Sequence, residues 1–462
     1  MSTVSIEPAG ETWRVLLFAR HGSELLVLRR PPGFCLPALT IPRGERIAAG
    51  LNAEARRLWK LSTVCVASFV VSHPDRSSDG ARYHVMEALS ADDLARIAPK
   101  TIDMATLKAE GFSDVRDYLA VRRAAGLEPE SLCRQQGPFS DFGVFERICR
   151  WVEQELKPSR KTWDGEFRQL HATPSFALIR FGTNTGAVWF KATGAPNQRE
   201  SNISRCLSNL FPAYTPEILS FRDDWNAWLA DELQGMALAS CRDHEAWCQA
   251  AKSMAQVQIA SIGHTRAILR SGALEARTAN LISQVTPFFS EIGRLMDIQV
   301  KTAPRRLTAS ELRLLAGQMN EALERLQVLA VPDTLNHFDL NPENVIVRSG
   351  NAKFLDWAEA AIGHPFLSFE YLRQHFSRQF GNEAGHSGEL LNAYAQEWRP
   401  LVTESVFHRA MELVPLVAPF AFAVTSLPWS SAHCDATTEA AGFLRGLARC
   451  MHREALQLTR AA

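Results

Sequence analysis

The chain has 462 residues, and its 50 Lys and Arg residues are balanced by 50 Asp and Glu residues, so the formal net charge is zero. This length is too great for one compact core and predicts two or three domains. A balanced charge gives no support for nucleic acid or an anionic membrane as a bulk partner.

Cysteine usage and hydropathy bear on the location of the protein. The nine cysteines include no CxxC pair and no Cys/His ligand spacing, so we expect reduced thiols in a cytoplasmic protein. The N-terminus has no basic segment followed by an apolar one, which argues against a signal peptide. The most apolar segment, Val414–Leu427, is shorter than the ~20 residues of a membrane span and contains Pro415 and Pro419. It predicts a buried, proline-interrupted helix.

Residues 12–98 predict a β-rich part with one helix. Two strand-like runs, TWRVLLFAR and ELLVLRR, flank a turn at His21-Gly22-Ser23, and the run FCLPALTIP precedes a helix with the sequence NAEARRLWKL. Two further apolar runs follow, Val64–Val71 and Tyr83–Leu89. This order of hairpin, strand and helix resembles a Nudix-type α/β/α sandwich, which we assign to residues 1–136.

The helix of this Nudix-like part lacks the residues of a hydrolase. Nudix hydrolases hold a divalent metal with the carboxylates of an Arg-Glu-x-x-Glu-Glu helix, whereas this helix reads Arg56-Arg57-Leu58-Trp59-Lys60. Glu45 and Glu54 are nearby, but a positively charged helix face does not gather Mg²⁺ and pyrophosphate together. We therefore expect a scaffold for packing or recognition, whose partner is a protein or a ligand.

The middle of the chain predicts a second domain. The turn-rich stretch 137–143, GPFSDFG, is typical of a linker. Residues 163–193 then predict three antiparallel strands, and the first turn, at 173–175, contains no glycine. Between the linker and the first strand, apolar residues at helical spacing predict a helix that ends before Pro158: Ile148, Trp151, Val152 and Leu156.

From about residue 244 onward the pattern becomes helical. Thr308 and Glu311 form a capping box that starts a helix with one apolar face. That helix leads into Asn336–Glu359, where two short apolar runs surround a turn at 349–351 and predict a hairpin.

The two ends of this hairpin carry polar side chains. Asp339 and Asn344 stand on one side and Asp356 on the other, and the hairpin makes these ends neighbours in space. Carboxylate and amide oxygens are hard ligands of the kind that Mg²⁺ prefers when it is shared with phosphates.

The order His337-x-Asp339-x₄-Asn344, followed by Asp356, resembles the catalytic loop and metal-binding segment of the protein-kinase-like fold. The group that it resembles most is that of aminoglycoside phosphotransferases and choline kinases. The resemblance implies an α+β, two-lobed fold, with a small β-rich lobe over residues 144–238 and a helical lobe over 239–462. It also implies transfer of the γ-phosphoryl group of ATP to a hydroxyl of a small-molecule acceptor.

The same resemblance implies roles for single residues. Asp339 would be the base or orienter for the acceptor hydroxyl, while Asn344 and Asp356 would hold Mg²⁺. Lys191, in the third strand, would contact the α- and β-phosphates, and Glu200, at a helix start, would fix its ammonium. His337 is expected to pack and to hydrogen-bond the backbone. The backbone of a further segment, Asp231-Glu232-Leu233, would pair with adenine.

Two departures from the family pattern leave an alternative open. The glycine-free turn at 173–175 and the loss of the hydrolase residues favour a catalytically inactive nucleotide-binding scaffold. The motifs HFD and DWA stand where protein kinases have His-Arg-Asp and Asp-Phe-Gly, so a protein hydroxyl is not the expected acceptor. Acceptor contacts are expected from the helical part, and the candidates there are Glu359, Glu370, His375 and Trp429.

Overall fold

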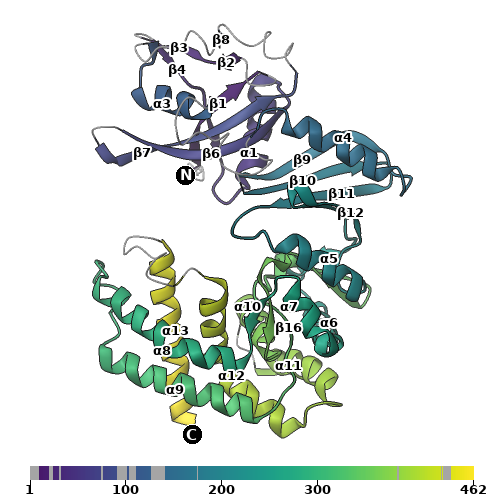
Figure 1. Ribbon diagram of the computed structural model, residues 1–462, viewed down its shortest axis with the longest axis vertical. Coiled ribbons are helices and arrows are strands. Elements are labelled where there is room, and N and C mark those ends of the chain that lie inside the picture. The colour runs from purple at the N-terminus through teal and green to yellow at the C-terminus, as the bar shows by residue number, and fades with distance from the viewer. Residues whose placement is uncertain are drawn as a thin grey trace, which may run out of the picture. The chain divides into compact units, whose positions relative to one another are not determined.

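The computed structural model describes residues 10–19, 24–30, 33–73, 76–90, 101–103, 111–125, 141–173, 175–381, 384–427, 429 and 439–461. They form two compact units, Met1–Ser201 with Ile218–Glu232, and Asn202–Glu217 with Leu233–Ala462. Both units contain helices and strands, so the α+β expectation is confirmed (Figure 1). The expected turn at 21–23 and part of the expected linker at 137–143 lie outside the described residues.

The N-terminal part of the first unit is a mixed sheet with a helix on each face. Its strand order is β6-β7-β1-β2-β8, and β5 pairs with β1. The strands are β1 (Glu11–Phe18), β2 (Glu24–Leu26), β5 (Ala38–Ile41), β6 (Thr63–His73), β7 (Arg76–Ala88) and β8 (Thr101–Asp103), and β3 (Leu28–Arg30) pairs separately with β4 (Gly33–Cys35). The helices are α1 (Ile47–Trp59) and α3 (Val115–Ala124).

Strand β1 shows why the helices lie on opposite faces. Successive side chains of a strand point to opposite faces of the sheet. Val15 and Leu17 accordingly pack in the cluster that contains residues of α1, whereas Leu16 and Phe18 pack in the cluster that contains residues of α3. The layers are therefore helix, sheet and helix, as the sequence predicts.

The second part of this unit is an antiparallel sheet with the strand order β12-β13-β11-β10-β9. Its strands are β9 (Trp163–Thr173), β10 (Phe176–Thr183), β11 (Gly186–Thr193), β12 (Ile218–Arg222) and β13 (Ala227–Asp231). Helix α4 (Val144–Leu156) covers one face and buries the four apolar residues that the helical spacing singled out. Phe190 points into this core, so its neighbour Lys191 points to the other face.

The N-terminal part and the five-stranded sheet are joined through the edge strand β9. Ala172 of β9 lies in the same apolar cluster as α1, which runs beside β9 in Figure 1. The buried side chain of Gln169 accepts a hydrogen bond from Cys65 N at 2.7 Å and donates one to Cys65 O at 2.8 Å. Residues 1–136 and the strands after residue 144, expected as separate domains, therefore share one compact unit.

The second unit is mostly helical. Its helices are α5 (Glu200–Leu210), α6 (His244–Ser261), α7 (Thr265–Arg270), α8 (Thr278–Asp297), α9 (Ala309–Val328), α10 (Phe366–Phe380), α11 (Ala384–Trp398), α12 (Glu404–Ser426) and α13 (Glu439–Ala461). The first two residues of α5, Glu200 and Ser201, belong to the first unit. The capping box of Thr308 and Glu311 at the start of α9 is confirmed.

Two small sheets lie among these helices, with the orders β14-β17-β18 and β15-β19-β16. Their strands are β14 (Met236–Ala237), β15 (Leu274–Ala276), β16 (Thr334–His337), β17 (Val345–Arg348), β18 (Asn351–Phe354) and β19 (Ala360–Gly363). Strands β17 and β18 are the predicted hairpin.

Helix α12 contains the most apolar stretch of the sequence. Within the described part of the chain it is long and apolar enough to cross a membrane by length and composition, and 61% of its most apolar window is buried in the structure. Pro415 and Pro419 both lie inside it, so the expected buried, proline-interrupted helix is confirmed.

Candidate active site

The loop after β16 brings two predicted site residues into contact. Asn344 Nδ2 donates to the carboxylate of Asp339 and also to its backbone oxygen, at 3.1 Å in both cases. A tight turn supports this geometry, because Asn341 N donates to Asp339 O at 2.7 Å. Asp339 is exposed and Asn344 half-buried, so the pair stands at the surface of the second unit.

Asp356 follows β18 with an unusual backbone. Its φ of 60° and ψ of 67° place its backbone in the left-handed region, which residues other than glycine rarely adopt. Both neighbours hold it there: Leu355 N donates to Asn344 O at 2.8 Å, and the buried Trp357 donates its indole N–H to Phe354 O at 3.1 Å. Left-handed residues held in this way gather at functional sites. The bond from Leu355 also brings the residue before Asp356 into contact with Asn344.

His337 has the structural role that the sequence predicts. Its side chain is fully buried, its ring packs 4.6 Å from that of Trp357, and Nε2 lies 2.7 Å from Leu355 O. This contact connects the loop that carries Asp339 to the segment that follows β18 and precedes Asp356.

A buried network that the sequence analysis missed fixes the start of this loop. Ser368 of α10 donates its hydroxyl to Asn336 Oδ1 at 2.8 Å and accepts from His337 N at 2.8 Å. Asn336 also donates to Gly363 O at 3.1 Å. All four residues of β16 are buried although three of them are polar, and buried polar groups need hydrogen-bond partners.

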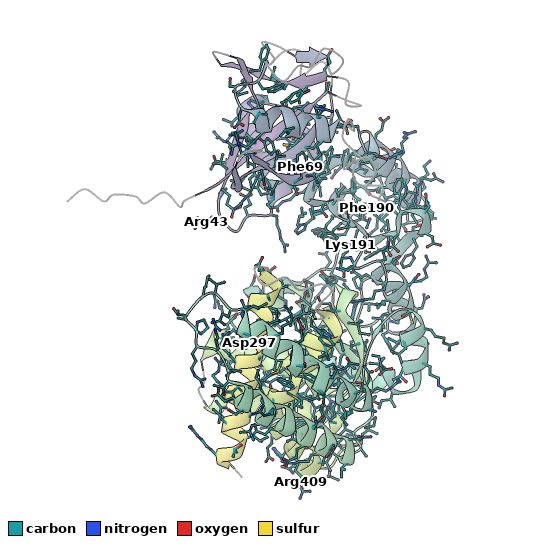
Figure 2. All side chains as sticks on the ribbon, turned by 60° about the vertical axis from the view of Figure 1, so that its left-hand side comes forward. Arg43, Phe69, Phe190, Lys191, Asp297 and Arg409 are labelled. Atoms are coloured by element: carbon teal, nitrogen blue, oxygen red, sulfur yellow. The ribbon has the colours of Figure 1, made fainter. Side chains whose placement is uncertain are left out.

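In the first unit, Lys191 and Glu200 form the predicted ion pair. Lys191 Nζ lies 2.5 Å from Glu200 Oε1, and their side chains are 12% and 2% exposed. The rings of Phe176 and Trp228 lie 5.4 and 5.7 Å from the ammonium. Figure 2 marks Lys191 on its strand. The pairing is confirmed, and the role of Lys191 towards phosphates stays a prediction.

The segment expected to pair with adenine has its acidic side chains held by bases of the same unit. Asp231 forms an ion pair with Lys161. Glu232 accepts from Arg180 at 2.6 and 2.8 Å, and this guanidinium lowers the pKa of the carboxyl. Leu233 follows, half-buried. These side chains fix the end of β13, and the backbone contact to adenine stays a prediction.

The donor atoms near Asp339 fit a magnesium ion shared with phosphates. Over the described ranges, no group of three or more His, Cys, Asp or Glu residues gathers at one point. Asn344 and Asp356 instead offer an amide and a carboxylate. Because the amide N–H of Asn344 is directed to Asp339, its oxygen is the atom suited to a cation. One or two protein oxygens, completed by water and phosphate, are what Mg²⁺ needs.

The acceptor candidates differ in what holds them. Glu370 is buried and accepts from Arg373 at 2.7 and 2.8 Å, and the indole of Trp429 donates to Val424 O at 3.1 Å, so both serve packing. Burial lowers the pKa of His375. Glu359 is half-buried and lies beside the loop, since its carbonyl accepts from Phe338 N.

Comparison with known proteins adds a family match over part of the chain. Residues 283–403, about a quarter of the sequence, match the model of the phosphotransferase enzyme family. No curated protein matches the chain.

Several solved structures resemble the chain at low identity. A macrolide 2′-phosphotransferase from Brachybacterium faecium is 14% identical, with a TM-score of 0.42, over 68% of this chain and 98% of its own. A choline kinase from Cryptosporidium parvum is 15% identical, with a TM-score of 0.48, over 69% and 96%. A choline kinase from Streptococcus pneumoniae is 12% identical, with a TM-score of 0.40, over 68% and 98%. At these values the likenesses do not by themselves assign a fold or a substrate. The segment that carries Asp339, Asn344 and Asp356 is thus the part of the chain that matches the phosphotransferase enzyme family.

Proposed function

We propose that this protein is a small-molecule kinase that transfers the γ-phosphoryl group of ATP to a hydroxyl of its acceptor. The observation that carries the proposal is the family match over residues 283–403, which spans the hydrogen-bonded pair Asp339–Asn344 and the left-handed Asp356. The buried Lys191–Glu200 pair of the first unit supports it independently.

The proposed chemistry asks mainly for positioning and charge. Asp339 orients the acceptor hydroxyl and accepts its proton, and the bond from Asn344 fixes the carboxylate for that purpose. Lys191 neutralises charge on the α- and β-phosphates, and Glu200 holds the ammonium in place. Asn344 and Asp356 would hold Mg²⁺, which would neutralise further phosphate charge.

The proposal extends to the architecture. We propose a two-lobed protein-kinase-like arrangement of residues 144–238 and 239–462, preceded by a Nudix-like part without hydrolase activity. The ion pair between Glu54 and Arg57 at 2.7 Å supports that absence, because Glu54 is the one carboxylate on helix α1 and it is already paired with an arginine. We also propose a cytoplasmic location, which the free thiols among the described residues support: Cys35, Cys65, Cys149, Cys206, Cys241, Cys248 and Cys450.

A nucleotide-binding scaffold without turnover is the second candidate. The observation that favours it is the glycine-free turn at 173–175, because protein kinases cover the phosphates with a glycine-rich loop. The two candidates differ in whether an acceptor stimulates ADP release.

The test compares Asp339→Asn with the wild type. The substitution keeps size and hydrogen bonding but removes the charge, so ATP affinity should survive while turnover falls roughly 10²–10⁴-fold. The assay measures ADP release across a panel of hydroxylated metabolites and aminoglycosides, with Mg·ATP binding measured in parallel. Asp297→Asn, at an exposed position of the same unit, is the matched control.

Undiminished turnover in Asp339→Asn would mean that the active site lies elsewhere. If the wild type binds Mg·ATP but shows no acceptor-dependent ADP release, the scaffold is favoured instead.

A further inference from the structure

The N-terminal part places an arginine beside the five-stranded sheet. Arg46 lies in the exposed turn 42–46, directly before α1, and its Nη1 atom lies 2.7 Å from Nε2 of His171. His171 belongs to β9, two residues before the end of that strand at Thr173. The contact therefore reaches the strand end that leads into the β9–β10 turn.

His171 shares a face of the sheet with Lys191. On β10, Leu178 stands directly opposite His171 of β9 and directly opposite Lys191 of β11. Residues directly opposite each other in antiparallel strands point to the same side. Two strand spacings separate His171 from Lys191, which is about 10 Å between their backbones.

The space between these residues is bridged by one ring. Phe176 lies with its centroid 5.1 Å from that of His171 and 5.4 Å from Lys191 Nζ. Arg46, His171, Phe176 and Lys191 thus form a continuous series on one face. Two cationic side chains stand at its ends, one from the N-terminal part and one from the sheet.

Described residues on both sides of the β9–β10 turn are anchored. On one side, Ala172 is buried in the core that contains α1. On the other, Gly194 N donates to Ser175 O at 2.6 Å, and a Cβ on Gly194 would lie only 3.1 Å from the Cα of Ser175. Since no glycine lies in this turn, a charged side chain close to it is a further candidate donor to a phosphate group.

We propose that Arg46 supplies this donor and binds a phosphate group of the nucleotide, so that the N-terminal part completes the phosphate subsite of the sheet. A guanidinium offers planar, paired N–H donors that match phosphate oxygens. The inference rests on the proposed function, because it takes the Lys191 face to be the nucleotide face. It also gives the N-terminal part a task that needs no hydrolase residues.

The test measures the affinity of the full-length chain for Mg·ATP and for adenosine by calorimetry. Arg46→Ala should weaken Mg·ATP binding by roughly tenfold to a hundredfold, the range of a charge-assisted hydrogen bond. Adenosine affinity should change by less than about twofold, since adenosine carries no phosphate. Arg46→Lys should retain part of the Mg·ATP affinity. Arg57→Ala is the matched control, because Arg57 is an exposed arginine paired with Glu54 on the same helix.

Lys191→Ala separates failure of this inference from failure of the proposed function. Loss of Mg·ATP affinity in Lys191→Ala but not in Arg46→Ala overturns the inference alone. An equal loss of ATP and adenosine affinity in Arg46→Ala also overturns it, because the arginine would then act through the fold. A wild type that does not bind Mg·ATP refutes the proposed function and this inference with it.

Discussion

The ion pair between Lys191 and Glu200 allows a quantitative test of the proposed nucleotide site. Glu200 is 2% exposed and Lys191 12% exposed, so each charge depends on the other far more than in a surface pair. Removing one partner of a buried pair costs about 3–5 kcal/mol, since the remaining charge loses its compensation. Lys191→Met and Glu200→Gln should therefore each destabilise the first unit by roughly this amount.

The double variant measures the coupling. With both charges removed, the loss of stability should fall short of the sum of the single losses by about 0.5–3 kcal/mol, the range found for residues in contact. Urea unfolding of the four proteins gives these values. Additive losses would show that the contact between Nζ and Oε1 contributes little.

Nucleotide affinity gives the functional half of the test. Lys191→Met should weaken Mg·ATP binding by about 10–100-fold, because a charged hydrogen bond is worth roughly 1.5–3 kcal/mol. Glu200→Gln should weaken it less, since the ammonium remains and only its position is loosened. A folded Lys191→Met variant that binds Mg·ATP as tightly as the wild type would refute the reasoning.

Three further predictions follow from other parts of the chain. Asp356→Ala should abolish the Mg²⁺ dependence of ATP affinity in calorimetry, and an unchanged dependence would exclude Asp356 as a ligand. The full-length chain should not hydrolyse nucleoside diphosphate derivatives with Mg²⁺ or Mn²⁺. Sustained metal-dependent turnover would contradict the prediction that a helix with the sequence Arg56–Lys60 lacks hydrolase activity. Burial lowers the pKa of His364 to about 3, so the unfolded chain binds the extra proton first as the pH falls below about 6.5. The wild type should lose about 2 kcal/mol of stability to this group between pH 7 and pH 5. The His364→Gln variant should lack this pH-dependent loss of stability in urea unfolding. An equal pH dependence of stability in the wild type and the variant would contradict the prediction.

Local patterns were sufficient to predict the elements that carry the site. The capping box at Thr308 predicted the start of α9, and the turn at 349–351 predicted the β17–β18 hairpin, because both depend on neighbours in sequence. The resemblance to the protein-kinase-like fold implied the pairing of Lys191 with Glu200. Each of these features spans only a few residues.

Contacts between distant residues could not be predicted in the same way. Gln169 and Cys65 are 104 positions apart in the sequence, and no local pattern around either residue predicts their hydrogen bonds. The same holds for Ser368 and Asn336, which are 32 positions apart. The left-handed backbone of Asp356 could not be predicted either, because most residues other than glycine disfavour it and no sequence pattern marks the position.

Strand β9 forms one end of its sheet and has β10 as its partner on the inner side. An exposed edge of this kind offers unpaired backbone groups to any other strand, and proteins protect such edges against self-association. Here Gln169 meets the backbone of Cys65 and Ala172 is buried against α1, so the N-terminal part shields the edge. A chain that begins at residue 144 would lose this protection. We expect it to aggregate through β9, which light scattering would detect. Expression of residues 144–462 alone would then need a replacement for that cover.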